Sequence, residues 1–293
     1  MTVWNVGSIN IDHFYDVPHI PAPGETLAAT DVRTGLGGKG ANQSVAAARA
    51  GARVHHIGAV GRDGGWAVDR MGRYGVGTDH ILVMDVPTGH AIITLASDGE
   101  NAIIIFGGAN TAMPADHVVA ALVAARAGDV LLLQNETLYQ PAAASAGQGA
   151  GLRVIYSAAP FDADAVVAVL PHVSLLVLNA VEAAQLEAAL GTALGDLPVP
   201  EIVVTRGAAG ADLRDTRTGA TVHVPAPTVD AVDTTGAGDT FAGYLAAGLD
   251  AGLPTVEAMA RAAAASALKV TRRGTADAIP DGDEVAAFLL TQA

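Results

Sequence analysis

Short runs of apolar residues alternate along the chain with Ala-rich segments of helical length. The apolar runs cover residues 3–9, 54–60, 130–133, 154–156, 175–178 and 202–204. Alternation of this kind is typical of βαβ units, in which helices cover both faces of a mainly parallel sheet. We therefore predict a three-layer α/β/α protein. Because no repeat or linker divides the sequence, we expect one domain over residues 1–293.

Polar residues follow several of these runs. In open α/β sheets, ligands bind outside the carboxyl ends of the strands. We therefore expect a binding site among the polar residues at these ends, which are Asn10, Asp12, residues 134–136, Ser157, Asn179, Thr205 and Arg206.

Two stretches interrupt the alternation. Residues 12–34 are rich in Pro, Gly and Asp, whereas residues 90–106 are two apolar runs around a Ser-Asp-Gly-Glu turn. The second pattern predicts a hairpin. Together the stretches predict a small β lid over the strand ends. A lid of this kind exposes strand edges, which proteins usually pair or cover, so we expect a homodimer joined through the lid.

The net charge and the absence of cysteine narrow the classes of function. A formal charge of −14 argues against nucleic acid and anionic membranes as partners, because both attract basic surfaces. Small molecules are the expected partners. Without cysteine, a disulfide framework, thiolate-bound zinc and a Cys nucleophile are excluded. No signal-peptide pattern and no apolar stretch of about twenty residues occur, so we expect a cytoplasmic protein.

A glycine-rich segment spans residues 35–42 (GLGGKGAN). It contains a G-x-G-x-x-G, but a dinucleotide fingerprint follows a buried strand, and residues 29–34 are largely polar. A phosphate-binding loop of the Walker type is excluded because Gly40 follows Lys39. We expect a flexible loop that opens a helix near Asn42, with a plain turn capped by Asn42 as the alternative. An NAD-dependent oxidoreductase remains a remote alternative.

Lysine is used sparingly in this chain. Lys39 and Lys269 are its only lysines among 16 basic residues. A lysine retained between glycines suggests that the loop needs a compact ammonium group.

A second small-residue segment, residues 233–241 (DTTGAGDTF), precedes a helical pattern with Phe241, Leu245 and Leu249 on one face. Residues 236–238 therefore lie at a helix N-terminus, where free amides attract anions such as phosphoryl groups. Asp239 either caps this helix or complements its charge, or it is a carboxylate that accepts a proton in phosphoryl transfer.

The two segments resemble the two signatures of the ribokinase (PfkB-type carbohydrate kinase) family, in residues 37–43 and 233–241. The resemblance runs over nearly the whole chain. It implies a ribokinase-like fold with a small β-sheet lid. It also implies transfer of the γ-phosphoryl of ATP to the primary hydroxyl of D-ribose. Fructose, ketodeoxygluconate and nucleosides are alternative substrates on the same scaffold, and a non-catalytic sugar-binding protein is a further alternative that Asp239 disfavours.

The resemblance also implies roles for single residues. The amides of Gly236, Ala237 and Gly238 would form an anion hole, with Asp239 as the catalytic base. The sugar hydroxyls would be held by Asn10, Asp12, Gly38, Lys39, Asn42, Glu136 and Asp239. The nucleotide and its Mg²⁺ would be bound near Asn179, Glu182, Thr205, Gly207, Gly210 and Gly238. A loop for a monovalent cation, suited to K⁺, would comprise Asp233, Thr235, Lys269, Arg272 and Gly274.

Three positions depart from the family pattern. Ala278 stands where a Ser is usual beside the loop for K⁺. Ser157 replaces an Asn that is common after that strand. His90 enters the lid where a small or apolar residue is more usual, either as a solvated lid residue or as a contact that alters substrate choice.

Overall fold

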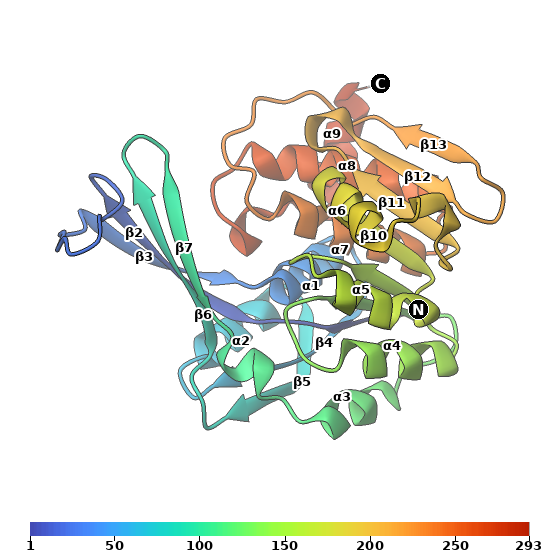
Figure 1. Cartoon of the computed structure of the whole chain (residues 1–293), viewed down its shortest axis with the longest axis horizontal. Helices are drawn as coiled ribbons and strands as arrows, with labels where there is room; N and C mark the ends of the chain where they lie inside the picture. The colour runs from blue at the N-terminus through green and yellow to red at the C-terminus, as the bar shows by residue number, and fades with distance from the viewer. Residues whose placement is uncertain (293) are drawn as a thin grey trace.

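The computed structural model describes residues 1–292, in which nine strands form a large sheet and four strands form a small one (Figure 1). The large sheet has the order β13-β12-β11-β10-β9-β8-β1-β4-β5. Its parallel strands are β1 (Val3–Val6), β4 (Val54–Gly61), β5 (Val76–Met84), β8 (Val130–Gln134), β9 (Arg153–Ser157), β10 (Leu175–Asn179) and β11 (Glu201–Thr205). Two antiparallel strands, β12 (Ala211–Asp215) and β13 (Thr221–Val224), complete one edge. The predicted α/β fold class is confirmed.

Helices cover the large sheet on both faces, as predicted. One face packs against α1 (Lys39–Arg49), α2 (Gly65–Arg73), α7 (Ala237–Asp250), α8 (Thr255–Val270) and α9 (Gly282–Gln292). The other packs against α3 (Ala115–Leu122), α4 (Gln140–Gly149), α5 (Ala163–Val169) and α6 (Ala180–Leu190). Successive strand residues alternate between these two cores, so that Leu132 lies in the first and Leu131 in the second. Continuous apolar runs are therefore required, because each strand is buried on both sides.

The small sheet projects from the body of the molecule (Figure 1). Its order is β3 (Asp31–Gly37), β2 (Asn10–Val17), β6 (Gly89–Ala96) and β7 (Asn101–Phe106). The hairpin predicted over residues 90–106 is confirmed as β6 and β7. The strand predicted over residues 3–9 ends at Val6, and Asn10 begins a strand of the small sheet.

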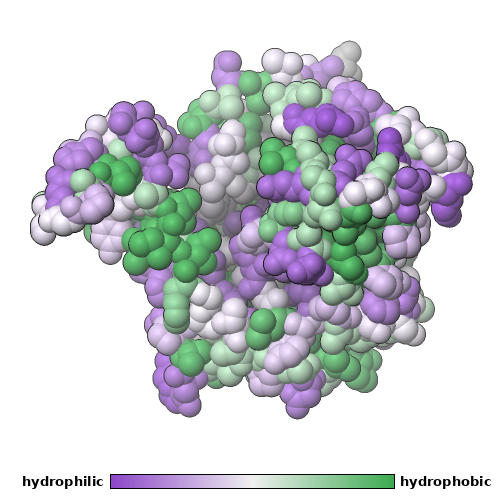
Figure 2. Space-filling model, viewed as in Figure 1, coloured by the Kyte–Doolittle hydropathy of each residue, from purple (hydrophilic) through white to green (hydrophobic). Residues whose placement is uncertain are grey.

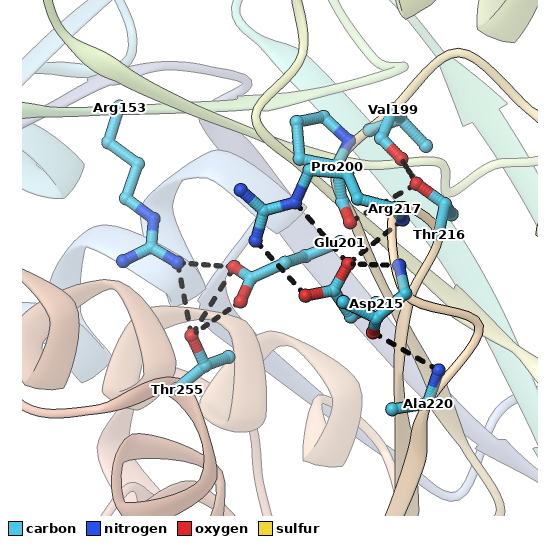
Figure 3. Close-up of polar contacts among 10 residues, drawn as sticks. Arg153, Val199, Pro200, Glu201, Asp215, Thr216, Arg217, Ala220 and Thr255 are labelled. Atoms are coloured by element: carbon cyan, nitrogen blue, oxygen red, sulfur yellow. Dashed lines mark hydrogen bonds and ion pairs between the residues drawn. The ribbon is translucent and has the colours of Figure 1, made fainter.

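Ion pairs and hydrogen bonds tie α8 to the sheet at the amino ends of the parallel strands (Figure 3). Arg153 of β9 pairs with Glu201 of β11, and the Thr255 hydroxyl at the start of α8 donates to the same carboxylate at 3.1 Å. On β12, Asp215 pairs with Arg217 at 3.0 Å. These contacts lie at the opposite end of the sheet from the polar residues predicted to bind a ligand. They therefore stabilise the fold and do not belong to the predicted binding site.

Within the described range, residues 1–292, no helix has both the length and the apolar character needed to cross a bilayer.

Candidate active site

Asp239 lies in the first turn of α7, which begins at Ala237 as predicted. Its buried carboxylate accepts hydrogen bonds from Asn42 Nδ2 at 3.0 Å and from Gln43 Nε2 at 3.1 Å. The residue at the N-cap position is Gly236, and no side chain caps this helix. The alternative that Asp239 is only a helix cap is therefore wrong, because its carboxylate is directed at α1.

The start of α7 presents amide groups near this carboxylate. Gly236 has a φ of 73°, a left-handed conformation that glycine adopts without strain. The Ala237 amide donates to the Thr234 carbonyl at 3.2 Å. Within residues 1–292, the amides of Gly236 and Gly238 have no backbone acceptor. Of the three residues predicted to form an anion hole, these two offer the available donors.

Close packing of α1 against α7 fixes the position of Asp239. A Cβ on Gly243 would lie 2.4 Å from the carbonyl oxygen of Gln43 and 2.5 Å from the Cβ of Ala46. The two helices can approach this closely only because Gly243 has no side chain. Gly243 lies one turn after Asp239. The close contact of the two helices therefore brings the Asp239 carboxylate to the side-chain amides of Asn42 and Gln43.

Lys39 is the first residue of α1, and Gly38 precedes it with a φ of 90°. The helix expected near Asn42 therefore begins three residues earlier, and Asn42 is not its cap. The Asp239 charge is the largest cause that raises the pKa of the half-buried Lys39 ammonium. Partial burial opposes this, and the charges of Glu136 and Glu182 raise the pKa further. Lys39 thus remains a cation among three carboxylates.

Glu136 and Ser8 hold the loop that precedes α1. One carboxylate oxygen of Glu136 accepts the Lys39 amide at 2.9 Å and also the Ser8 hydroxyl. The Ser8 oxygen in turn accepts the Gly40 amide at 3.2 Å. Ser8 follows the first strand with the other polar residues, but its local sequence does not indicate this role.

Asp12 is buried on β2, beside the glycine-rich segment. Burial is the main cause that raises its pKa to about 7, with the charges of Glu136 and Asp239 adding to it. A Cβ on Gly37 would lie 2.0 Å from its carboxylate, so glycine is required there. The register pairs Asp12 with Ala91 of β6 and so places His90 on the opposite face of the small sheet. This geometry favours the interpretation of His90 as a lid residue over that of a contact with the substrate. The centroids of the His90 and Phe106 rings lie 5.2 Å apart.

Asn10 is held by a residue whose role the sequence did not reveal. Asn110 Nδ2 donates to the side-chain oxygen of Asn10 at 2.8 Å, and Asn110 Oδ1 accepts the Ile9 amide at 2.9 Å. All three residues are buried. The contact joins positions about a hundred residues apart in the chain, so local sequence patterns could not indicate it.

A cavity of about 290 Å³ lies beside the start of α7. Four of the six residues predicted to bind nucleotide line it, namely Thr205, Gly207, Gly210 and Gly238. The remaining lining is largely apolar and includes Val229, Phe241 and Val270. An apolar cavity that ends at free helix amides suits a molecule with a flat ring and a phosphate tail.

The other two predicted nucleotide residues lie outside this cavity lining. Asn179 and Glu182 form a capping box at the start of α6. The Asn179 side chain accepts the Val181 and Glu182 amides at 2.9 Å each, and Glu182 accepts the Asn179 amide at 2.8 Å. Their spacing therefore has a structural cause. The Glu182 charge still reaches Lys39.

The five residues of the predicted cation loop lie together. The Asp233 carboxylate accepts the amides of Thr235 and Gly274, both at 2.9 Å. The Lys269 carbonyl accepts the Arg272 amide at 2.9 Å. Lys269 also points its ammonium at the backbone carbonyl of Asp233, with Nζ 2.9 Å from the oxygen. A K⁺ ion that bound this carbonyl would lie beside a buried positive charge, so these residues do not fit K⁺.

The glycine-rich segment does not have the setting of a dinucleotide site. Gly35 and Gly37 belong to β3, an edge strand of the small sheet whose first four residues are exposed. A dinucleotide fingerprint follows a buried central strand. The oxidoreductase alternative is therefore not supported.

Known proteins resemble this chain over its whole length. The family described as pfkB family carbohydrate kinase matches residues 2–282. The ribokinase of Haemophilus influenzae is 33% identical over 302 residues, covering 98% of each chain. Among solved structures, ribokinase from Cryptococcus neoformans with ADP has a TM-score of 0.89 at 32% identity and covers 98% of this chain and 99% of its own. Arabidopsis thaliana ribokinase complexed with ribose and ATP has a TM-score of 0.86 at 30% identity, with 98% of each chain covered. On these matches, the chain belongs to the pfkB family of carbohydrate kinases.

Proposed function

We propose that this protein is an ATP-dependent kinase that phosphorylates the primary hydroxyl of D-ribose to give ribose 5-phosphate. The observation that carries the proposal is the Asp239 carboxylate. It is buried at the N-terminus of α7, between the polar residues of α1 and β2 and the cavity beside Gly238. Relatives and structures that bear the name ribokinase, one of them complexed with ribose and ATP, support ribose as the acceptor.

The sugar binds between the small sheet and α1. Polar side chains that suit a polyol gather here, namely Asn10, Asp12, Lys39, Asn42 and Glu136, together with the backbone of Gly38. The buried Asn42 Oδ1 has no hydrogen-bond partner within residues 1–292. Because an unpaired buried acceptor is costly, a sugar hydroxyl that donates to it would be bound favourably.

The phosphoryl group moves at the start of α7. Asp239 accepts the proton of the attacking hydroxyl, while Asn42 and Gln43 hold its carboxylate in place. The amides of Gly236 and Gly238 and the Lys39 ammonium stabilise the negative charge that develops on the moving group. ATP occupies the cavity lined by Thr205, Gly207 and Gly210.

A magnesium ion bound mainly by phosphates and waters fits the carboxylates available here. Within residues 1–292 no group of three or more His, Cys, Asp and Glu side chains forms a metal site. Glu182, with one oxygen in the capping box, would contact the waters of the ion. Bound Mg²⁺ would neutralise phosphate charge.

The small sheet serves as a lid, formed by residues 12–34 and 90–106 of a single catalytic domain that spans residues 1–293. Its outer strand β7 exposes a run of apolar residues, with Ile104 68% and Ile105 63% exposed. Figure 2 shows this apolar surface on the projecting sheet. An exposed apolar edge strand is usually paired in solution, so we propose a homodimer in which the lids of two copies meet. Since the reaction consumes ATP, we place the enzyme in the cytoplasm.

Release of ADP in the presence of ATP, Mg²⁺ and single sugars or nucleosides tests the function. Ribose should give the highest kcat/KM, and turnover that is confined to another acceptor would contradict the proposal. Asp239→Asn should lower kcat by roughly 10²- to 10⁴-fold and leave ribose binding measurable by calorimetry. Asp250→Asn at the far end of the same helix is the matched control, since it removes a buried carboxylate away from the site.

A further inference from the structure

Lys269 lies in the last turn of α8, and its side chain is fully buried at 0% exposure. A lysine at this position of a helix ordinarily extends into solvent, because burying an ammonium is costly unless polar partners compensate it. Its Nζ donates to the carbonyl oxygen of Asp233 at 2.9 Å. The chain has only one other lysine, Lys39, and that residue lies in the active site.

The surroundings of Lys269 are built to hold a positive charge. Burial alone would raise the pKa of the Asp233 carboxyl, but the amides of Gly274 and Thr235, the Thr235 hydroxyl and the Lys269 charge lower it overall. Asp233 is therefore an anion next to the ammonium. Burial lowers the pKa of Lys269 overall, and the charges of Asp233 and Asp239 oppose this shift, so the ammonium is within electrostatic reach of the Asp239 carboxylate.

The same loop offers few free oxygens to a metal ion. The carboxylate of Asp233 accepts two amides, its carbonyl accepts the ammonium, and the Lys269 carbonyl accepts the Arg272 amide. The Arg272 side chain turns away to Glu284 at 2.6 Å. Ala278 is buried nearby and contributes only a methyl group.

The loop is joined directly to the anion-binding turn. Residues 233–235 lead into Gly236, and the amides of Val232 and Asp233 donate to the Val270 carbonyl at 2.7 and 3.0 Å. From α8, the Ser266 hydroxyl donates to the Ala237 carbonyl at 3.0 Å. A cation at Asp233 therefore holds the turn that presents the amides of Gly236 and Gly238.

We propose that the Lys269 ammonium takes the place of a monovalent cation, so that this kinase carries its activating cation as part of the chain and works without K⁺. The inference rests on the proposed kinase function. It differs from the expectation that K⁺ binds at this loop, because the ammonium already occupies the Asp233 carbonyl.

The test compares cations in buffers of equal ionic strength that contain K⁺, Na⁺ or tetramethylammonium. The wild-type kcat should be equal in all three within about twofold. Lys269→Ala removes the charge and leaves space, so its kcat should fall by about tenfold in tetramethylammonium. K⁺ should restore the kcat of Lys269→Ala, and tetramethylammonium should not. Lys269→Met fills the space without a charge and should lose activity that K⁺ does not restore.

Thermal unfolding gives a second readout that needs no substrate. K⁺ should raise the Tm of Lys269→Ala and leave the Tm of the wild type unchanged. A wild-type enzyme that K⁺ activates several-fold would overturn the inference, as would a Lys269→Ala enzyme with full activity in tetramethylammonium. If Lys269→Ala does not fold, the wild-type kcat values in the three cations decide whether the enzyme works without K⁺. If no acceptor is phosphorylated in any buffer, the proposed function fails, and the Tm measurements still decide whether Lys269 replaces K⁺.

Discussion

The side-chain amide of Gln43 donates to the Asp239 carboxylate, with Nε2 3.1 Å from Oδ1. Asn42 Nδ2 donates to the other carboxylate oxygen at 3.0 Å. This carboxylate, which we propose as the catalytic base, is thus held on both oxygens by consecutive residues of α1. Asn42 also belongs to the proposed sugar site, whereas Gln43 is fully buried and its side-chain amide donates to Asp239.

Replacement of Gln43 by Leu should therefore impair turnover more than binding. We expect kcat to fall by roughly 10- to 100-fold, a cost typical of losing a group that orients a catalytic side chain. The KM for ribose should change by less than about threefold, because Gln43 does not contact the sugar. Steady-state kinetics on the folded variant, with its Tm as the control for stability, separate this effect from misfolding. A rise in KM alone would show that Gln43 belongs to the sugar site.

Asp12 should make the stability of the free enzyme depend on pH. Its pKa is raised from 3.8 to about 7 by burial and by the charges of Glu136 and Asp239. Between these values the native state keeps a proton that the unfolded chain releases, so the free energy of unfolding decreases as pH rises through this range. Asp12→Asn removes this titration. The variant should show a flatter Tm between pH 3.8 and about 7 and a higher Tm than the wild type above pH 7.

The same variant should bind ribose poorly. The KM should rise by about tenfold or more, since a hydrogen bond to a charged group contributes about 1.5–3 kcal/mol. Thermal shift measurements over a pH series, with and without ribose, check both effects. An Asp12→Asn enzyme with wild-type pH dependence of Tm would contradict the assignment.

Gly243→Ala should damage both stability and activity. The new methyl group would meet the Gln43 carbonyl oxygen at 2.4 Å, so α1 and α7 must separate. We expect a loss of about 1–3 kcal/mol in the free energy of unfolding, as is typical of overpacking, and a lower kcat as Asp239 moves from its partners. Gly72→Ala is the matched control, because Gly72 lies in α2 with open space around its Cβ. That variant should gain stability by up to about 1 kcal/mol.

A charge on the lid edge should prevent dimer formation. Ile104→Lys places an ammonium in the middle of β7, where two lids would meet, and should shift the protein to monomer in size-exclusion chromatography with light scattering. Val123→Lys is the control, since Val123 is 81% exposed at the end of α3, away from the small sheet. A wild-type protein that is a monomer at all concentrations would contradict the proposed dimer.

Local patterns in the sequence were sufficient for the layers of the fold and for the start of α7. Residues 130–133 and 202–204 are apolar because both faces of their strands are covered, and that requirement is visible in a single segment. The hairpin over residues 90–106 was predicted for a similar reason, since its turn residues and its two apolar runs are adjacent in the chain.

The contacts that complete the site could not be predicted, because they join distant parts of the chain. Asn42 has a side chain that commonly caps helices, so the sequence favoured a helix start there. In the structure this side chain is bound to Asp239, which lies 197 positions further along. Lys269 likewise resembles an ordinary basic residue at a helix C-terminus, and only the packing of α8 shows that it is buried.

Helix α7 is buried on every side from Asp239 to Asp250, whereas β7 is exposed along its whole length. The residue that we propose as the base is thus anchored in a fully buried helix, where substitutions are costly. We place part of the acceptor recognition on the small sheet, whose outer strand β7 is exposed within one copy of the chain. A descendant of this protein can therefore acquire a new acceptor through changes in the projecting sheet while its transfer machinery stays the same.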